Sequence, residues 1–358
     1  MVMYMKKVAV ITYCEWNSYG SICQAYGLKK TIESLGCTET IYKTFRMESP
    51  LRKRVKKSLK SIAKYLLTLP HLKKINRIYK NNSAFIDENF SICYYNGYED
   101  LKDSVPEADF YLTGSDQVWN PDEIRKEMFL DFNTGQKPRI SYAASFGSQK
   151  MSEENRRYIE KSLNTFDVIS VREKSMISII KDMDPDLNPQ VHIDPTFLLP
   201  ADEWVKCSSE RKDIPKKYIL VYALYWNSEL NKELAALSET TDLPVVSVQL
   251  GKRAIYCQKT LLDSDVREFL WLIKNAEYVI TSSFHGLAFS IIFNKKFSAA
   301  INPDAPSRLK DILECFSIDN CGIRELPSGF SADYKSVNKK IEEEREKGIG
   351  YLRSILYG

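Results

Sequence analysis

The sequence predicts an α/β protein with two Rossmann-like domains, mostly parallel sheets and a cleft between the domains. At 358 residues the chain is long enough for two domains of ordinary size. Short apolar runs typical of buried strands alternate with segments of helical periodicity in both halves. A stretch rich in proline and charge, residues 195–215, lies between the halves and predicts a linker.

Apolar runs predict a first domain over residues 1–200. Strands are expected at Lys7–Tyr13, Thr38–Lys43, Asp109–Thr113, Arg139–Phe146, Asp167–Val171 and Val191–Asp194. Apolar residues from Ile22 to Leu35 recur at helical spacing, and Gly36 follows them as a left-handed helix end. This alternation favours a parallel sheet covered by helices.

The same alternation predicts a second domain over residues 201–333. Strands are expected at Tyr218–Leu224, Val245–Gln249, Tyr278–Thr281 and Phe297–Ile301, with helices near Glu229–Ser238, Asp265–Asn275, Gly286–Phe293 and Arg308–Phe316. Residues 334–358 predict a C-terminal helix interrupted at Gly348 and Gly350. Two Rossmann-like halves with a cleft between them resemble the GT-B arrangement.

Composition excludes several classes of protein. Hydrophobic residues make up 44% and charged residues 27%, a balance typical of a folded chain rather than a disordered or fibrous one. No apolar run approaches the length of a membrane span, and the first residues do not form a signal peptide. Eight scattered cysteines without a C-x-x-C pair indicate reduced thiols, so we expect a cytoplasmic protein.

A basic stretch, residues 51–80, contains eleven lysines or arginines and no acid. Val55, Leu59, Ile62 and Leu66 recur within it at helical spacing, so the charges flank one apolar stripe. The stretch fits a surface helix docked on its own domain or a peripheral contact with an anionic membrane face. Nucleic acid is not expected as a partner, because aromatic residues are sparse among the charges.

Two loops that follow predicted strands of the first half carry polar side chains, and ligands of open α/β sheets bind at that edge. The loop 16–20 opens a helix that carries Gln24, and its free amides suit an anion or a sugar hydroxyl; an ordinary turn is the alternative. The loop 114–121 combines a carboxylate, amides and a hydroxyl with Trp119, a mixture typical of sugar binding. Trp119 either stacks on a sugar or belongs to the core.

Two further loops carry cationic or titratable side chains. Arg172 emerges at a strand end where a helix begins, so it can bind a carboxylate or phosphate with two hydrogen bonds, or form a surface ion pair with Glu173. His285 lies where a strand of the second half enters a helix, and it is one of only three histidines. Its side chain suits general acid–base work, with a structural role as the alternative.

Two pairs of aspartates match the D-x-D spacing of metal–nucleotide sites. Pro185 splits the pair formed by Asp184 and Asp186, and the pair formed by Asp263 and Asp265 is typical of a helix start. No metal site is therefore predicted.

Five strings in order make the likeness to a known family specific. They are Gly114–Pro121, Ser141–Gly147, Ser170–Glu173, Asp194–Thr196 and Ser282–Phe289. On these strings, from about Asn17 to Arg308, the chain resembles the polysaccharide pyruvyl transferase family.

The resemblance implies a GT-B-like enzyme that uses phosphoenolpyruvate as donor. The expected product is a pyruvate ketal on a sugar of a surface glycan or of its lipid-linked precursor, with phosphate released. Phosphoenolpyruvate is then a co-substrate, and neither a cofactor nor a metal is required. The reaction needs a proton donor, a base for the sugar hydroxyls, and cations for the charged donor.

The resemblance also assigns residues. Arg172 matches the family's donor-binding arginine, and His285 its histidine, a general acid or phosphate ligand. The expected donor-binding set is Arg172, Ser283, Phe284, His285, Gly286, Lys296 and Arg308. The expected acceptor-binding set is Asn17, Tyr19, Gly20, Gln24, Ser115, Asp116, Gln117, Trp119 and Asn120.

The chain departs from better-known relatives at two positions. They carry Arg-Leu-His where this chain has Ser283-Phe284-His285, so Arg308 or Lys296 is expected to supply the missing positive charge. They also carry an aspartate where this chain has Ser21, which leaves Asp116 as the candidate base. Two alternatives stay open: a GT-B glycosyltransferase that uses a nucleotide-sugar donor, and a non-catalytic glycan-binding relative.

Overall fold

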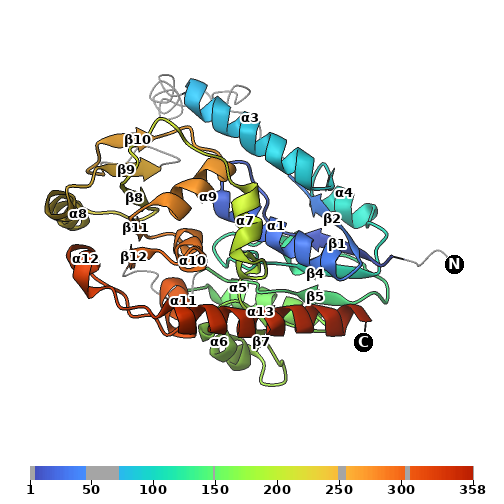
Figure 1. Cartoon of the computed structure of the whole chain (residues 1–358). Coiled ribbons are helices and arrows are strands. Elements are labelled where there is room, and N and C mark those ends of the chain that lie inside the picture. The colour runs from blue at the N-terminus through green and yellow to red at the C-terminus, as the bar shows by residue number, and fades with distance from the viewer. Residues whose placement is uncertain (1–4, 46–71, 148–149, 249–254, 303–306, 358) are drawn as a thin grey trace, which may run out of the picture.

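The first domain is built around a parallel sheet (Figure 1). The structure is a computed structural model that describes residues 5–45, 72–147, 150–248, 255–302 and 307–357. The strand order is β3-β2-β1-β4-β5. The strands are β1 (Lys7–Ile11), β2 (Thr38–Lys43), β3 (Ile92–Tyr94), β4 (Phe110–Thr113) and β5 (Arg139–Ser141).

A short strand pair extends this sheet toward the site. Strands β6 (Ser170–Val171) and β7 (Gln190–Val191) pair with each other in parallel. Single bridges from Ile140 to Val168 and from Ala144 to Val171 join the pair to the β5 side of the sheet. Residues just after β6 and β7 therefore lie along the same carboxyl edge as the loops after β1 and β4.

Helices cover both faces of the first sheet because its central strands are apolar on both sides. They are α1 (Tyr19–Ser34), α3 (Leu72–Asn89), α4 (Tyr98–Asp103), α5 (Glu153–Leu163) and α6 (Ser175–Met183). Helix α1 begins at Ser18, whose side chain accepts a hydrogen bond from the Ser21 amide. It ends before Gly36, which has the left-handed φ of +74° predicted for this position.

The second domain repeats the same plan with strand order β10-β9-β8-β11-β12, all parallel. Its strands are β8 (Ile219–Tyr222), β9 (Val245–Val248), β10 (Lys259–Leu261), β11 (Tyr278–Thr281) and β12 (Lys296–Ala299). Its helices are α8 (Ser228–Thr241), α9 (Val266–Asn275), α10 (Phe284–Ile292), α11 (Ser307–Cys315) and α12 (Leu326–Gly329). Two parallel α/β domains confirm the predicted fold class.

The segment between the domains, predicted as a linker from its prolines and charges, has structure of its own. It contains a 3-10 turn at Pro195–Phe197 and helix α7 (Ala201–Cys207), whose Trp204 is fully buried. The carbonyl of Pro195 lies so close to Gly27 on α1 that a side chain at Gly27 would collide with it. The connection is thus packed into the core, which apolar burial favours over a free linker.

Helix α13 (Tyr334–Tyr357) follows the second domain in sequence but returns to the first (Figure 1). The expected interruption at Gly348 and Gly350 is wrong, because the helix runs through both. Gly348 instead permits close contact with Tyr142, since a Cβ there would lie 2.4 Å from the Tyr142 hydroxyl. The Tyr351 hydroxyl donates to the Ser141 carbonyl at 2.9 Å.

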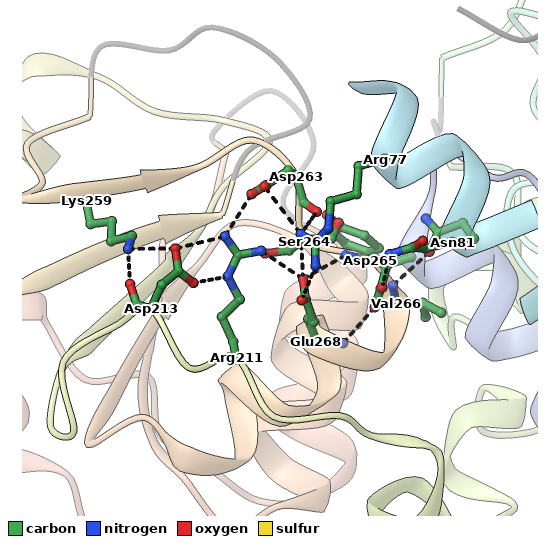
Figure 2. A network of polar contacts seen from close by, with 12 residues as sticks. Arg77, Asn81, Arg211, Asp213, Lys259, Asp263, Ser264, Asp265, Val266 and Glu268 are labelled. Atoms are coloured by element: carbon green, nitrogen blue, oxygen red, sulfur yellow. Dashed lines mark hydrogen bonds and ion pairs between the residues drawn. The ribbon is translucent and has the colours of Figure 1, made fainter. Parts of the chain in front are cut away.

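Ion pairs join the two domains at the contact between α3 and α9 (Figure 2). Arg77 of α3 donates to the Glu268 carboxylate at 2.5 Å and to the Asp263 carbonyl at 2.7 Å. Arg211 forms ion pairs with the carboxylates of Asp263 and Glu268, each at 3.0 Å. The Asn82 side chain accepts from the Val266 amide at 2.8 Å. Residues 51–71 of the basic stretch lie outside the described residues.

None of the helices in the described part of the chain is long and apolar enough to cross a membrane.

Candidate functional site

Three side chains from both domains meet at the carboxyl edges of the sheets. Arg172 follows β6, Asp194 follows β7, and His285 lies in the first turn of α10 after β11. All three residues are buried, and the Asp194 carboxylate is fully enclosed. Arg172 and His285, which the sequence singled out separately, lie on the same oxygen of Asp194, at 3.1 Å and 3.7 Å.

The Arg172 guanidinium is held in one orientation. Its Nη1 donates to Asp194 at 3.1 Å, and its Nε donates to Glu173 at 2.8 Å. The guanidinium carbon lies 4.0 Å from the centre of the Phe284 ring, which supports the cation from the second domain. Within the described residues Nη2 is buried and has no hydrogen-bond partner. Two edges of the guanidinium are fixed, and one N–H edge is left for a ligand.

Asp194 is surrounded by donors. Its Oδ1 accepts from the Thr196 amide at 3.0 Å and from the Thr196 hydroxyl at 2.9 Å, while its Oδ2 accepts from Arg172 and lies 3.1 Å from the Ser115 hydroxyl. Burial by itself raises the pKa of Asp194, but the charges of His285 and Arg172 outweigh it and hold this pKa well below its usual range. The carboxylate is therefore ionised although it is fully buried.

The His285 imidazole lies between the two domains. Its Nε2 is 3.7 Å from Asp194 Oδ2, a distance for electrostatic attraction rather than a hydrogen bond. Its Nδ1 side packs on Gly20 of α1, where a Cβ would lie 2.1 Å from the ring nitrogen. The Ser283 hydroxyl accepts a hydrogen bond from the Gly286 amide at 3.4 Å and so caps the N-terminus of α10. Buried Nε2 has no hydrogen-bond partner in the described part of the chain.

A cavity of about 760 Å³ opens beside these groups. Arg172, Asp194, Phe284 and Arg308 are part of its lining. The Arg308 Nε is buried without a hydrogen-bond partner among the described residues. Burial and the charge of Arg172 both lower the pKa of Arg308, so the two guanidinium groups lie close enough to repel each other. Neighbouring cations with free N–H groups favour binding of an anion.

Lys296 does not belong to this site. It is exposed at the amino end of β12, while the site lies beyond the carboxyl ends of the strands, and its Nζ is 3.4 Å from the Pro327 carbonyl. Of the two cations expected to replace the missing arginine, only Arg308 lies at the cavity. The expectation for Lys296 is therefore wrong.

Trp119 is a core residue, which corrects the expectation that it stacks on an acceptor. It is fully buried among Phe129, Phe146 and Phe166, and its indole N–H donates to the Met128 carbonyl at 3.2 Å. No face of the ring is open to a sugar.

Other residues of the expected acceptor set support the loops. Tyr19 is buried and its hydroxyl donates to the Ser264 carbonyl of the second domain at 2.6 Å. Gln24 is fully buried, and its side-chain oxygen accepts from the Ser115 amide at 3.0 Å. These two side chains position the loops 16–20 and 114–121 and have no open surface for a ligand.

Four members of the acceptor set retain exposed surface. Asp116 lies 4.0 Å from Arg172, at the edge of the site. Asn17 is exposed, and Gln117 and Asn120 are half-buried in the loop that carries Asp116. Nothing in the structure contradicts a contact between these residues and an acceptor.

Asp194 and Gly20 have roles that the sequence did not assign. In the sequence Asp194 stands out only within Asp194–Thr196, although a carboxylate after a strand and before Pro-Thr is a usable signal. Gly20 was placed in the acceptor set, whereas its lack of a side chain makes room for His285. Contacts across domains are not visible in local patterns.

The D-x-D aspartates serve structural roles. The Asp265 side chain caps α9 by accepting from the Glu268 amide at 3.0 Å, and Asp263 pairs with Arg211. The Asp184 carboxylate accepts from the Asp186 amide at 2.9 Å. Among the residues that the structure describes, no cluster of three metal-ligating side chains is found.

Solved structures share this fold over nearly the whole chain. UDP-GlcNAc 2-epimerase from Neisseria meningitidis, bound to UDP-GlcNAc, aligns with a TM-score of 0.56 and 9% identity over 98% of this chain and 99% of that chain. S. aureus MnaA with UDP aligns at 0.55 and 12% over 98% and 97%. LpCGTa in complex with UDP aligns at 0.54 and 12% over 98% and 99%. At such low identity these similarities show the fold alone, which is GT-B-like.

A family assignment comes from the sequence comparison. No curated protein sequence matches this chain. The family model described as polysaccharide pyruvyl transferase matches residues 19–304, which include Arg172, Asp194 and His285. With the match extending over most of its length, the chain belongs to the polysaccharide pyruvyl transferase family.

Proposed function

We propose that this protein transfers pyruvate from phosphoenolpyruvate to a sugar of a surface glycan or of its lipid-linked precursor. The product is a cyclic ketal across two sugar hydroxyls, and phosphate is released. The observation that supports this proposal most directly is the set of buried, unpartnered nitrogens among the described residues: Arg172 Nη2, Arg308 Nε and His285 Nε2. A buried donor without a partner is costly, so a ligand with many acceptor oxygens fits here.

Phosphoenolpyruvate matches this set in charge and in shape. Its carboxylate and phosphate are planar or tetrahedral groups of oxygens, which guanidinium groups bind with paired hydrogen bonds. Arg172 and Arg308 supply those groups from the two domains, and the Phe284 ring holds Arg172 in place. Asp116 is the candidate base because its half-buried carboxylate lies 4.0 Å from Arg172 and keeps some exposed surface.

The reaction needs a proton donor, and His285 is the residue to which this role is assigned. In the reaction a proton adds to the methylene carbon of the donor and turns it into a methyl group. A sugar hydroxyl bonds to the adjacent carbon, the bond from that carbon to the phosphate oxygen breaks, and a second hydroxyl closes the ring. Of the two hydroxyl protons, one balances the methyl group and one leaves with phosphate. His285 acts as general acid in this scheme, and Asp116 receives a hydroxyl proton.

The acceptor and the membrane contact are part of the same proposal. A lipid-linked acceptor would bring the enzyme to an anionic membrane face, and the basic stretch 51–80 suits such a contact. Flotation with anionic liposomes should then be lost in high salt. Equal flotation with neutral liposomes argues against the contact and leaves the pyruvyl transfer untouched.

The decisive experiment measures donor use. Purified protein is incubated with phosphoenolpyruvate and glycan extract, phosphate is quantified, and the glycan is analysed by mass spectrometry for a pyruvate substituent. UDP-sugars replace the donor in a parallel reaction. Phosphate release coupled to a pyruvylated glycan supports the proposal. Sugar transfer from a UDP-sugar identifies a glycosyltransferase instead, and ligand binding without turnover identifies a non-catalytic relative.

A further inference from the structure

A second pocket lies at the carboxyl edge of the first sheet and shares no lining residue with the cavity beside Arg172. It is lined by Trp16 in the loop after β1, Lys43 at the end of β2 and Tyr94 at the end of β3, together with α3. Open α/β sheets bind ligands at this edge. The pocket has a volume of about 70 Å³, which is room for several water molecules and hence for part of one sugar ring.

Aromatic rings form much of the pocket wall. The rings of Trp16 and Tyr79 meet edge to face, with their centroids 5.4 Å apart. Tyr79, Ser83 and Asp87 of α3 line the pocket at intervals of four residues, so they belong to one face of the helix. Aromatic rings suit the apolar side of a sugar, and neighbouring carboxylate and hydroxyl groups suit its hydroxyls.

The indole of Trp16 provides a hydrogen-bond donor that is not used. Trp16 Nε1 is buried and has no hydrogen-bond partner among the described residues. The backbone of the same residue is held in place, because the Trp16 carbonyl accepts from the Asn82 side chain at 2.6 Å. A buried N–H without a partner is costly, so an acceptor oxygen supplied by a ligand would be stabilising here.

The charge of this pocket differs from that of the donor site. The Lys43 ammonium pairs with Glu15, donates to the Cys14 carbonyl at 3.0 Å and leaves only 3% of its side chain exposed. Among the described lining residues, two carboxylates, Glu15 and Asp87, outnumber the one ammonium of Lys43 and leave a net charge of −1. An anion such as phosphoenolpyruvate is repelled by this balance, whereas an uncharged ligand rich in hydroxyl groups fits it.

The loop after β1 connects this pocket with the site of pyruvyl transfer. Gly20, four residues after Trp16, lies against the His285 ring. Four residues extend over at most about 14 Å, and this loop is shorter because the Ser18 amide donates to the Glu15 carbonyl at 2.9 Å. Neighbouring units of one glycan chain can therefore reach both places. We propose that the pocket binds an uncharged sugar unit of the acceptor glycan, near the unit that receives pyruvate; this inference rests on the proposed function.

The test follows the indole N–H of Trp16 without any turnover. Tryptophan ring nitrogens are labelled with ¹⁵N, and the five indole signals are assigned by replacing one tryptophan at a time with phenylalanine. Neutral and acidic oligosaccharide fractions of the glycan extract, and phosphoenolpyruvate, are added in separate titrations. The neutral fraction should shift the Trp16 signal in a saturable manner. The Trp226 signal is the matched control and should not move, because this half-buried indole lies outside the pocket and donates to Asn231 at 2.6 Å.

Two variants measure how the pocket holds the sugar. Trp16→Phe keeps an aromatic ring and removes the N–H, so calorimetry should show about 2- to 10-fold weaker binding of the neutral fraction. Asp87→Asn lies at an exposed position of α3 and leaves Trp16 in place, so its titration can be followed by the same indole signal and should need more of the neutral fraction. The proposal is overturned if the neutral fraction leaves the Trp16 signal unchanged, if it shifts Trp226 equally, or if only phosphoenolpyruvate or the acidic fraction shifts Trp16.

Turnover separates a sugar subsite from a structural role. With phosphoenolpyruvate and glycan extract, Trp16→Phe should raise the KM for the glycan by about 2- to 10-fold and change the KM for phosphoenolpyruvate much less, while Trp226→Phe should change neither. Equal effects on both KM values overturn the subsite. Absence of phosphate release in the wild-type protein, together with a shifted Trp16 signal, would refute the proposed function and leave a sugar-binding pocket. Phosphate release with an unchanged Trp16 signal would refute the pocket alone.

Discussion

The imidazole of His285 rests against the backbone of Gly20, although the two residues belong to different domains. A Cβ on Gly20 would lie 2.1 Å from Nδ1 and 2.5 Å from Cγ of the ring. No side chain other than hydrogen fits at this position while the ring stays where it is. The start of α1 therefore sets the position of the candidate general acid on α10.

Gly20→Ala should displace His285 and lower turnover by about 10-fold or more, because a shifted proton donor loses its alignment with the donor's carbon. Steady-state kinetics with phosphoenolpyruvate measure the effect. Gly350→Ala is the matched control, since a Cβ at Gly350 of α13 meets nothing within 4 Å. Equal activity of both variants would contradict the positional role of Gly20.

Arg172→Ala should chiefly weaken donor use. Loss of one charged contact costs about 1.5–3 kcal/mol, which corresponds to about a 10- to 150-fold higher KM for phosphoenolpyruvate. Arg172→Lys should recover only part of this loss, because an ammonium group cannot hold Asp194 and Glu173 and also bind the donor with two hydrogen bonds. A wild-type KM in the alanine variant would remove Arg172 from the donor site.

His285→Ala should lower turnover by about 100-fold or more while binding of phosphoenolpyruvate remains measurable by calorimetry. His285→Asn separates two roles, because the amide keeps a hydrogen-bond donor but has no transferable proton. Substantial turnover in the asparagine variant would make His285 a phosphate ligand only. Full turnover in the alanine variant would exclude it from the site.

Trp119→Ala should destabilise the protein by about 3–5 kcal/mol, because the change leaves a cavity among three phenylalanines. Thermal unfolding measures the loss. Trp119→Phe, which fills most of the space, should fold with a KM for the glycan close to that of the wild type. A raised KM in a stable Trp119→Phe protein would restore a role in acceptor binding.

His192 makes stability depend on pH. Burial is the main cause that lowers the pKa of His192 to about 4, with Tyr351 and Tyr142 packed on its ring. The unfolded chain takes up this proton near pH 6.5, so the unfolded state binds more protons below that pH. Its contribution to stability, up to about 3 kcal/mol, is complete above pH 6.5 and is lost as the pH falls to 4.

Urea unfolding at several pH values measures this contribution. In His192→Gln the free energy of unfolding should change less between pH 6.5 and pH 4 than in the wild type. Identical pH dependence of the two proteins would show that His192 titrates alike in the folded and unfolded states.

Local patterns in the sequence predicted the parts of the fold that depend on local chemistry. The central strands were predicted because they are continuous apolar runs, such as Tyr278–Thr281. Strands β3 and β10 were missed because they are short and partly exposed at sheet edges. The interruption of α13 was predicted wrongly because a packing contact of Gly348 with Tyr142 outweighs the low helix propensity of glycine.

The same limit applies to the site. Arg172 and His285 were found because they follow strands, and strand ends can be located from the sequence. The meeting of Arg172 and His285 on Asp194 depends on how the two domains pack, which no local spacing records. Trp119 was misplaced because a tryptophan in a polar loop has the same local pattern whether it faces a sugar or the core.

The return of α13 to the first domain has a consequence for how the chain folds during synthesis. Domains usually fold in the order in which the ribosome releases them. Here Tyr351 bonds to the end of β5, and the Lys6 ammonium beside β1 bonds to the Leu356 carbonyl. The first domain thus lacks part of its surface until the whole second domain has been translated. A nascent chain would expose to chaperones, for that entire interval, the apolar residues of the first domain that α13 covers.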